Sequence, residues 1–201
     1  MGGEAGHYFD ADPRVPSQPR TVRLDLPAGS ISLRTDRGVF AADGVDAATK
    51  LLLLEAPEPP AAGTFVDLGC GYGPIACTLA ARVPAATVWA VDVNRRALDL
   101  CRENAATLGL PNVVAYEPEA VPAEGSVDLI WSNPPIRIGK PALHELLVGW
   151  LARLTPAGAA VLVVHKHLGA DSLQRWLDAE GWPTTRLGSR DGNRLLRVTP
   201  P

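Results

Sequence analysis

The sequence contains few cysteines. Its 201 residues include only three, Cys70, Cys77 and Cys101, and no two of them form a CxxC pair. Disulfide frameworks use even sets of cysteines and zinc sites use closely spaced ones, so this pattern argues against both. We therefore expect three small packing residues in a protein of the reducing cytoplasm, and no bound metal.

Long apolar runs are also missing. No stretch approaches the roughly 20 apolar residues that a membrane-spanning helix needs. The N-terminal residues 1–4 have neither the basic nor the apolar character of a signal peptide. These absences predict no membrane partner and a cytoplasmic location. A hydrophobic content of 46% in 201 residues is typical of one domain with a sizeable core.

Neither sign of charge is in large excess. The formal net charge is −3, which is not typical of a dedicated nucleic-acid binder. The distribution is uneven, because nine Lys or Arg residues follow position 129 against five acidic ones. Ordinary solvation explains any single one of these charges. Together they mildly favour an anionic macromolecule as the partner.

The N-terminal quarter contains two different kinds of segment. Residues 1–20 hold three prolines and show no periodicity, so we expect an extended N-terminal arm. Residues 21–26 and 31–35 alternate strictly between apolar and polar side chains, which predicts a β-hairpin. A helix capped by Asp43 or Asp46 should follow and end before residue 57.

From residue 64 onward, short apolar segments alternate with helical ones. Strands that are apolar on both faces and separated by helices indicate an α/β fold. We expect a Rossmann-like, mostly parallel, doubly wound sheet with helices on both faces, within a single domain over residues 21–201. The predicted strands are 65–68, 87–91, 113–116, 127–131 and 159–165, the predicted helices begin near Pro74, Asn94, Pro141 and Asp171, and residues 184–187 and 195–199 predict an antiparallel C-terminal hairpin.

A glycine-rich turn ends the first parallel strand. Gly69, Gly71 and Gly73 form a GxGxG pattern that lets a ligand press against bare backbone. Asp67 precedes this turn, and Asp92 ends the next strand about 20 residues later, where an acid commonly binds ribose. A lone GxGxG is more often an ordinary turn. The combination favours a nucleoside cofactor with a positive centre, and the missing GxxG spacing disfavours NAD.

A second motif, Asn133-Pro134-Pro135, follows the strand predicted at 127–131. Its Asn133 carboxamide oxygen and Pro134 carbonyl could accept the two N–H bonds of a planar amino group and aim its lone pair at a methyl donor. Proline fixes φ and adds no competing N–H group. Asn-Pro can also simply start a turn. Its place at the same sheet edge as Asp92 favours a methyl transfer driven by alignment.

These motifs resemble those of class I S-adenosylmethionine-dependent methyltransferases, and the resemblance extends over nearly the whole chain from residue 21. It implies that Gly69, Gly71 and Gly73 wrap the amino-acid part of S-adenosylmethionine and that Asp92 holds its ribose. It also implies an acid that reaches the adenine. Glu119 is our choice for that acid, with Glu117 as the alternative.

Residues 35–46 and 133–140 are similar to the "methyltransferase small" group. Its best-known members, the ribosomal RNA small subunit methyltransferase C enzymes, methylate guanine N2. This resemblance implies that Phe40 and Asp43 help to close the cofactor pocket, although Phe40 could equally be core. Two features depart from those enzymes. Ile136, which would contact the base, stands where they carry a stacking aromatic residue, and we expect no room in this chain for their second, N-terminal domain. Arg137 and Lys140 are plausible phosphate contacts.

Three functions are therefore open. The favoured one is methylation of the exocyclic N2 amine of a guanine in small-subunit rRNA, with rRNA or a ribosomal subunit as the partner. The second is methylation of a protein glutamine amide, because an Asn-Pro-Pro motif followed by an aromatic residue serves that reaction as well. The third is a non-catalytic module that binds S-adenosylmethionine or RNA, which the intact Asn-Pro-Pro motif disfavours.

Overall fold

The computed structural model describes residues 11–13 and 15–201, and its centre is a seven-stranded sheet of order β5-β4-β3-β6-β7-β9-β8. The five strands that pair in parallel are β3 (Gly63–Leu68), β4 (Ala86–Val91), β5 (Val113–Tyr116), β6 (Val127–Ser132) and β7 (Leu154–His165). The last two strands, β8 (Thr184–Arg190) and β9 (Asn193–Val198), form an antiparallel hairpin whose β9 pairs with β7. The predicted sheet and C-terminal hairpin are confirmed.

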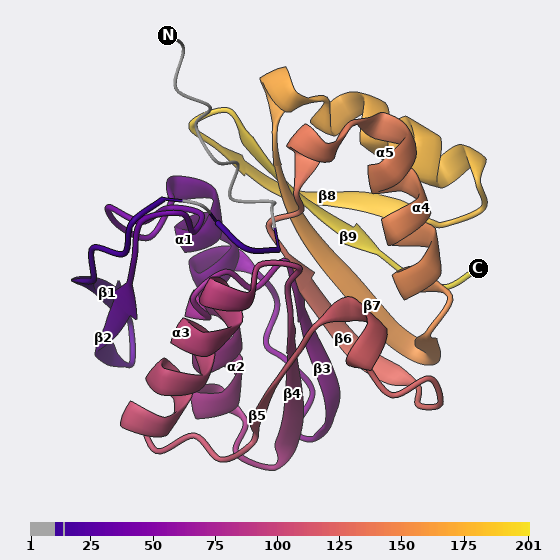
Figure 1. Cartoon of the computed structure of the whole chain (residues 1–201). Coiled ribbons are helices and arrows are strands. Elements are labelled where there is room, and N and C mark those ends of the chain that lie inside the picture. Colours follow the sequence, from indigo (N-terminus) through magenta and orange to yellow (C-terminus); the bar gives the residue numbers. More distant parts are fainter. Residues whose placement is uncertain (1–10, 14) are drawn as a thin grey trace, which may run out of the picture.

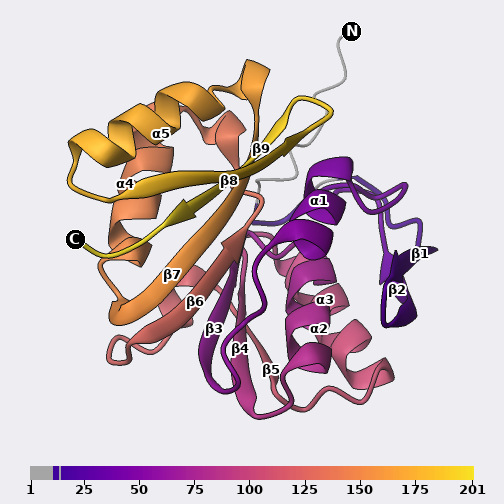
Figure 2. The same ribbon diagram turned by 180° about the vertical axis from the view of Figure 1, so that it is seen from behind.

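Helices cover both faces of this sheet (Figures 1 and 2). One face carries α1 (Ala47–Glu55), α2 (Pro74–Arg82) and α3 (Arg95–Thr107). The other carries α4 (Lys140–Leu151) and α5 (Ala170–Ala179). Neighbouring residues of the same strand enter different cores, as Phe65 and Val66 of β3 do. Both faces of the strands are therefore buried, as their continuous apolar character requires.

A separate two-stranded hairpin, β1 (Arg20–Leu26) and β2 (Gly29–Thr35), lies beside α3 (Figure 1). Its Leu24 and Leu33 side chains are completely buried in the core shared with the first three helices. Asn104 of α3 accepts from the Arg34 N–H group at 2.7 Å and donates to the Arg34 carbonyl at 2.9 Å. The hairpin is thus a fixed part of this core.

The predicted N-terminal arm lies partly outside the described residues. Among those described, Ala11 accepts at its carbonyl from the Arg95 N–H group at 2.9 Å. The Ser17 hydroxyl donates to the buried Asp36 carboxylate at 2.6 Å. This part of the arm lies against the N-terminus of α3.

Two strand boundaries differ from the prediction by more than two residues. Strand β7 begins at Leu154 rather than at residue 159, and β8 continues to Arg190 rather than ending at 187. The sequence does not indicate the start of β7, because Pro156 and Gly158 are residues typical of loops.

The part of the chain that the structure describes also contains three short 3-10 helices: η1 (Pro118–Ala120), η2 (Ile136–Ile138) and η3 (Lys166–Leu168). No helix in this part has the length and apolar character needed to cross a membrane.

Candidate active site

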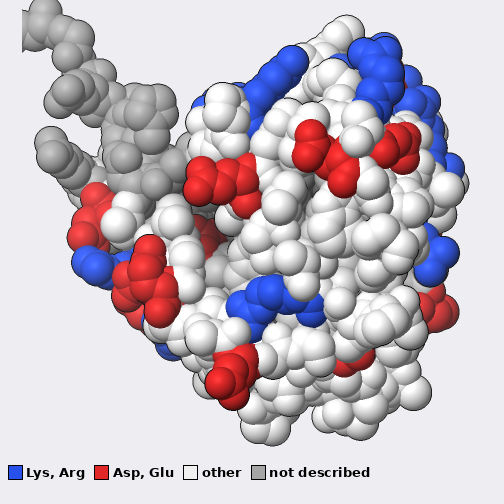
Figure 3. Space-filling view, turned by 90° about the vertical axis from the view of Figure 1, so that its right-hand side faces the viewer, with Lys and Arg blue, Asp and Glu red and all other residues white. Residues whose placement is uncertain are grey.

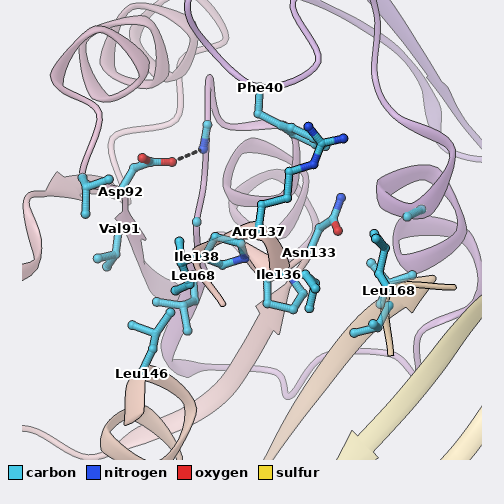
Figure 4. Close-up of a pocket in the computed structure, with 18 of the residues that line it drawn as sticks. Phe40, Leu68, Val91, Asp92, Asn133, Ile136, Arg137, Ile138, Leu146 and Leu168 are labelled. Carbon is cyan, nitrogen blue, oxygen red and sulfur yellow. Dashed lines mark hydrogen bonds between the residues drawn. The ribbon is translucent and has the colours of Figure 1, made fainter. Parts of the chain in front are cut away.

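An open cavity of about 1040 Å³ lies at the carboxyl ends of β3, β4 and β6 (Figure 4). The chain proceeds from β3 outward to β4 and β5, then returns to the other side of β3 as β6. Ligands of doubly wound sheets bind at such a reversal of strand order. Of the residues predicted for the site, nine line the cavity: Phe40, Gly69, Gly71, Asp92, Asn133, Pro134, Pro135, Ile136 and Arg137.

The glycine-rich turn is held against the end of β4. Gly69 and Cys70 donate their N–H groups to the Val91 carbonyl at 2.8 and 3.0 Å. Asp92 accepts from the Gly71 N–H group at 2.8 Å and from the Asn94 N–H group at 2.9 Å. Desolvation raises the pKa of Asp92 above its ordinary value, and these hydrogen bonds oppose the shift. The turn and the acid therefore form one rigid unit.

The turn leaves room where a ligand could lie. A Cβ atom built on Gly71, at φ +54°, would meet no other atom within 4 Å. Leu68 and Val91 provide apolar walls beside the Asp92 carboxylate (Figure 4). Bare backbone, one acid and apolar walls fit a nucleoside with free hydroxyl groups. The residues present thus fit the predicted cofactor.

Gly73 does not line this cavity, although a cofactor contact was predicted for it. It is the N-cap of α2 with φ +92°, and its own Cβ would lie 2.7 Å from Cys101 Sγ. Its lack of a side chain therefore allows α3 to pack closely against the start of α2.

Asp67 is completely buried and does not line the cavity, so the predicted contact with an ammonium group does not agree with the structure. Its Oδ2 accepts from the Ala76 N–H group in the first turn of α2 at 2.9 Å. Desolvation raises the pKa of Asp67 to about 8. Because neighbouring residues of a strand point to opposite faces, Leu68 reaches the cavity and Asp67 turns toward α2.

Two further predicted contacts fall outside the cavity. Glu119 is exposed on η1, and the lining residue there is the adjacent Pro118. The alternative acid, Glu117, pairs with Arg95 at 3.1 Å and does not line the cavity either. Lys140 is exposed at the first position of α4 and is not among the lining residues, although Ile138 and Ala142 are. The structure therefore supports neither an adenine contact by Glu119 nor a place for Lys140 in the cavity.

The Asn133 side chain is fixed by neighbours on α1. Its Nδ2 atom donates to Asp46 Oδ2 at 2.6 Å and to Thr49 Oγ1 at 3.1 Å. A carboxylate can only accept, so the nitrogen must face Asp46. Both N–H bonds are then used, and the carboxamide oxygen remains available to the cavity, which Asn133 lines (Figure 4).

The two prolines form a tight turn beside this amide. The Ile136 N–H group donates to the Pro134 carbonyl at 2.8 Å, and Pro135 has φ −74° and ψ 67°. These values define an inverse γ-turn. The prolines add no N–H group of their own, as expected, but the Ile136 N–H group occupies one lone pair of the Pro134 carbonyl. A carbonyl oxygen has two lone pairs, and the second one can still accept.

The cavity also includes residues that the motifs did not indicate. Asp46 was predicted only as a possible helix cap, and its link to Asn133 joins positions too distant in sequence to leave a local signal. Arg137, which was predicted, lines the same cavity as Phe40, Asn133 and Ile136 (Figure 4). Other lining residues come from α4, from the end of β7 and from the β8–β9 turn: Ala142, Leu146, His165, Leu168, Asp191 and Asn193.

Acidic partners reduce the positive charge of the C-terminal third. Arg186 pairs with Asp171 at 2.5 Å, and Arg190 pairs with Glu55 at 3.2 Å. Figure 3 shows Lys and Arg side chains at the upper edge of the face formed by α4 and α5, with acidic side chains nearby. Positive and negative side chains therefore lie closer together on this surface than the basic C-terminal sequence suggests.

Comparison with known proteins decides the family. The profile of the methyltransferase small domain matches residues 30–180. The chain belongs to the methyltransferase small family. By family it is a methyltransferase that uses S-adenosylmethionine, as predicted from the two motifs.

Relatives of this methyltransferase vary in length. The chain is 35% identical over 169 residues to the uncharacterized protein YbxB of Bacillus subtilis, covering 83% of this chain and 84% of the relative. It is 32% identical over 150 residues to ribosomal RNA small subunit methyltransferase C of Shewanella halifaxensis, covering 73% of this chain. The match spans only 43% of that longer relative.

A solved structure shows the same fold. The 16S rRNA N2 guanine methyltransferase of T. thermophilus, in complex with AdoMet and guanosine, superimposes with a TM-score of 0.77. The superposition covers 94% of this chain and 52% of that chain, at 23% sequence identity. The Rossmann-like methyltransferase fold predicted from the sequence is therefore confirmed.

Proposed function

We propose that this methyltransferase methylates the exocyclic N2 amine of a guanine in small-subunit rRNA. The observation that carries the proposal is the fixed Asn133 carboxamide, whose nitrogen is bound by Asp46 and Thr49 and whose oxygen is left for a substrate donor. Relatives named ribosomal RNA small subunit methyltransferase C, at 32% identity, support rRNA as the substrate class.

In this proposal the glycine turn and Asp92 hold the cofactor. Gly69 and Gly71 lie against its amino-acid part, and Asp92, which keeps free lone pairs beside its two backbone donors, accepts from the ribose hydroxyl groups. Phe40 closes the cavity from the other side. When bound, S-adenosylmethionine supplies a methyl group on a positively charged sulfur.

Asn133 and Pro134 prepare the amine. The amine nitrogen of guanine is a poor nucleophile, because its lone pair is delocalised into the ring. Two acceptors, the Asn133 carboxamide oxygen and the second lone pair of the Pro134 carbonyl, hold its two N–H bonds and turn the lone pair toward the methyl carbon. In this orientation the nitrogen lone pair would take the methyl group that the bound cofactor supplies, and the electrons of the broken S–C bond would stay on sulfur. The surplus proton leaves to solvent through the open cavity.

Other lining residues position the RNA. Ile136 packs against the base, and Arg137 reaches a phosphate group from the mouth of the cavity (Figure 4). An aliphatic side chain forgoes the roughly 1–3 kcal/mol per base that an aromatic platform provides. Lys140, exposed at the start of α4, contacts phosphate outside the cavity.

The test is transfer of a labelled methyl group from S-adenosylmethionine to separate RNA and protein fractions, followed by nucleoside analysis. We expect label in RNA as N2-methylguanosine, and no label with the Asn133→Ala variant. Label in a protein glutamine would indicate the amide methyltransferase instead. Cofactor binding without any transfer would indicate a non-catalytic module.

A further inference from the structure

We infer that Asp46 is a positioning residue for the methyl transfer: it locks the orientation of the Asn133 carboxamide so that its oxygen, and never its nitrogen, faces the substrate amine. This inference rests on the proposed function, in which the Asn133 oxygen is the acceptor. Asp46 contacts Asn133, and no contact with substrate or cofactor is assigned to it.

The Asp46 carboxylate is itself held firmly. It is the N-cap of α1, where it accepts from the N–H groups of Ala48 and Thr49, each at 3.1 Å. The Thr49 hydroxyl donates to the same Oδ2 atom at 3.1 Å. A negative charge is also favoured at a helix N-terminus, where the peptide dipoles leave partial positive charge. These hydrogen bonds therefore fix the position of the carboxylate.

Asn133 completes a closed set of hydrogen bonds. Its Nδ2 atom donates to Asp46 Oδ2 at 2.6 Å and to Thr49 Oγ1 at 3.1 Å. Thr49 is buried, and its hydroxyl accepts from Asn133 while donating to Asp46. Each donor in this triangle has an acceptor, and both hydrogens of the amide nitrogen are used.

The two ends of a carboxamide have nearly the same shape but opposite hydrogen-bonding character. A half-turn of the Asn133 amide would place its oxygen against the Asp46 carboxylate, acceptor against acceptor. It would also point two N–H donors at the substrate amine, whose N–H bonds need acceptors. The Asp46 carboxylate excludes this orientation, because it has no proton to donate.

Helix capping alone does not explain this residue. Ser, Thr and Asn cap helices as well as Asp does, and each has a side-chain oxygen for the backbone donors. Only a carboxylate has two oxygen acceptors and no hydrogen-bond donor, so Asp46 can cap the helix and also accept from the Asn133 amide nitrogen. Asp46 also lines the cavity beside Asn133, so its charge lies next to the reacting groups.

The first test is Asp46→Asn, which keeps an oxygen for the cap but can turn an amide nitrogen toward Asn133. We expect kcat to fall roughly 100-fold, the size of effect seen when one preorganised hydrogen bond at a reacting group is lost. The dissociation constant for S-adenosylmethionine and the melting temperature should stay close to those of the wild type. Asp99→Asn is the matched control, because that exposed residue outside the cavity undergoes the same change of charge. Equal turnover by Asp46→Asn and the wild type would overturn the inference.

The second test exchanges donor and acceptor in the double variant D46N/N133D. The amide at position 46 then donates to a carboxylate at position 133, which still presents an oxygen to the substrate. We expect the double variant to turn over faster than D46N and N133D, although each change alone impairs the enzyme. Turnover equal to the product of the two single effects would show that the residues act independently, and would overturn the inference.

A third measurement does not depend on the reaction. Hydrogen exchange of the Asn133 side-chain amide, followed by nitrogen-15 NMR, should be slow in the wild type and fast in D46N. If the wild type transfers no methyl group to RNA but this difference is found, the proposed function fails and the locked amide stands. Fast exchange in the wild type overturns the inference even if rRNA is methylated.

Discussion

A hydrogen bond of 2.6 Å joins Asn133 Nδ2 to Asp46 Oδ2 across 87 residues of sequence. It connects the end of β6 with the N-terminus of α1, and so ties the Asn-Pro-Pro turn to the helical layer on one face of the sheet. The cavity opens between this contact and the glycine turn. The relative placement of acceptor and cofactor is thus set by the packing of the fold.

Replacing Asn133 by Ala should separate binding from chemistry. The cofactor-facing Gly69, Gly71 and Asp92 are unchanged, so calorimetry should give a dissociation constant for S-adenosylmethionine close to the wild-type value. Turnover should fall roughly 100-fold or more, because one of the two acceptors for the amine is gone. A variant that turned over at the wild-type rate would show that the amine is held elsewhere.

Two glycines of the turn should respond differently to Ala. Gly73→Ala adds a Cβ atom that would lie 2.7 Å from Cys101 Sγ, at a φ of +92°. It should lower the free energy of unfolding by about 1–3 kcal/mol, measured by urea denaturation. Gly71→Ala, with open space and φ +54°, should cost only about 1 kcal/mol in stability but should weaken cofactor binding.

The control for this pair is Gly73→Ala combined with Cys101→Ala, which removes the clashing sulfur. The double variant should lose less stability than the sum of its two single changes. A Gly73→Ala protein as stable as Gly71→Ala would contradict the account of close packing between α2 and α3.

Asp67 should make stability depend on pH. Burial raises its pKa to about 8 in the folded protein, against 3.8 as the ordinary value. Between these pH values the folded state holds a proton that the unfolded state has released. The free energy of unfolding therefore receives a contribution that falls as pH rises from about 4 to about 8.

The Asp67→Asn variant cannot ionise and still offers an oxygen to the Ala76 N–H group. Urea midpoints measured from pH 5 to pH 8 should decline less steeply for this variant than for the wild type. Parallel pH profiles for the two proteins would show that Asp67 is ionised when folded.

Asp92→Asn should weaken cofactor binding. The carboxylate accepts from the backbone N–H groups of Gly71 and Asn94 and, in our proposal, from the ribose, and an amide has only one oxygen to share. The dissociation constant for S-adenosylmethionine should rise roughly tenfold or more, as expected for the loss of a hydrogen bond to a charged group. Asp99→Asn, an exposed change on α3, is the control and should bind normally. Unchanged binding by Asp92→Asn would place the ribose elsewhere.

Much of the fold could be predicted, because local patterns mark most elements. Asn94 accepts from the Ala97 N–H group at the start of α3, as its position in the sequence indicates. The start of β7 could not be predicted, because it depends on pairing. Leu154 pairs with Val127, and the Cβ of Gly158 would lie only 3.0 Å from the Val127 carbonyl. Gly158, a residue type typical of loops, has no side chain and therefore permits this close approach of the two strands.

The sequence predicts a site residue correctly only where the motif also determines the direction in which that residue points. Gly71, Asp92 and Asn133 follow the carboxyl ends of β3, β4 and β6, and all three line the cavity. Asp67 lies within β3, and its side chain points to the face of the sheet that does not line the cavity. The Asp46 contact is a tertiary relationship, which no spacing in the sequence encodes.

The most direct test of the central claim is mass mapping of small-subunit rRNA from a strain that lacks this protein. The account predicts one guanine missing a single methyl group at N2, restored by the wild-type protein and left missing with the Asn133→Ala variant. Fully methylated rRNA in the deletion strain, or restoration by Asn133→Ala, would contradict it.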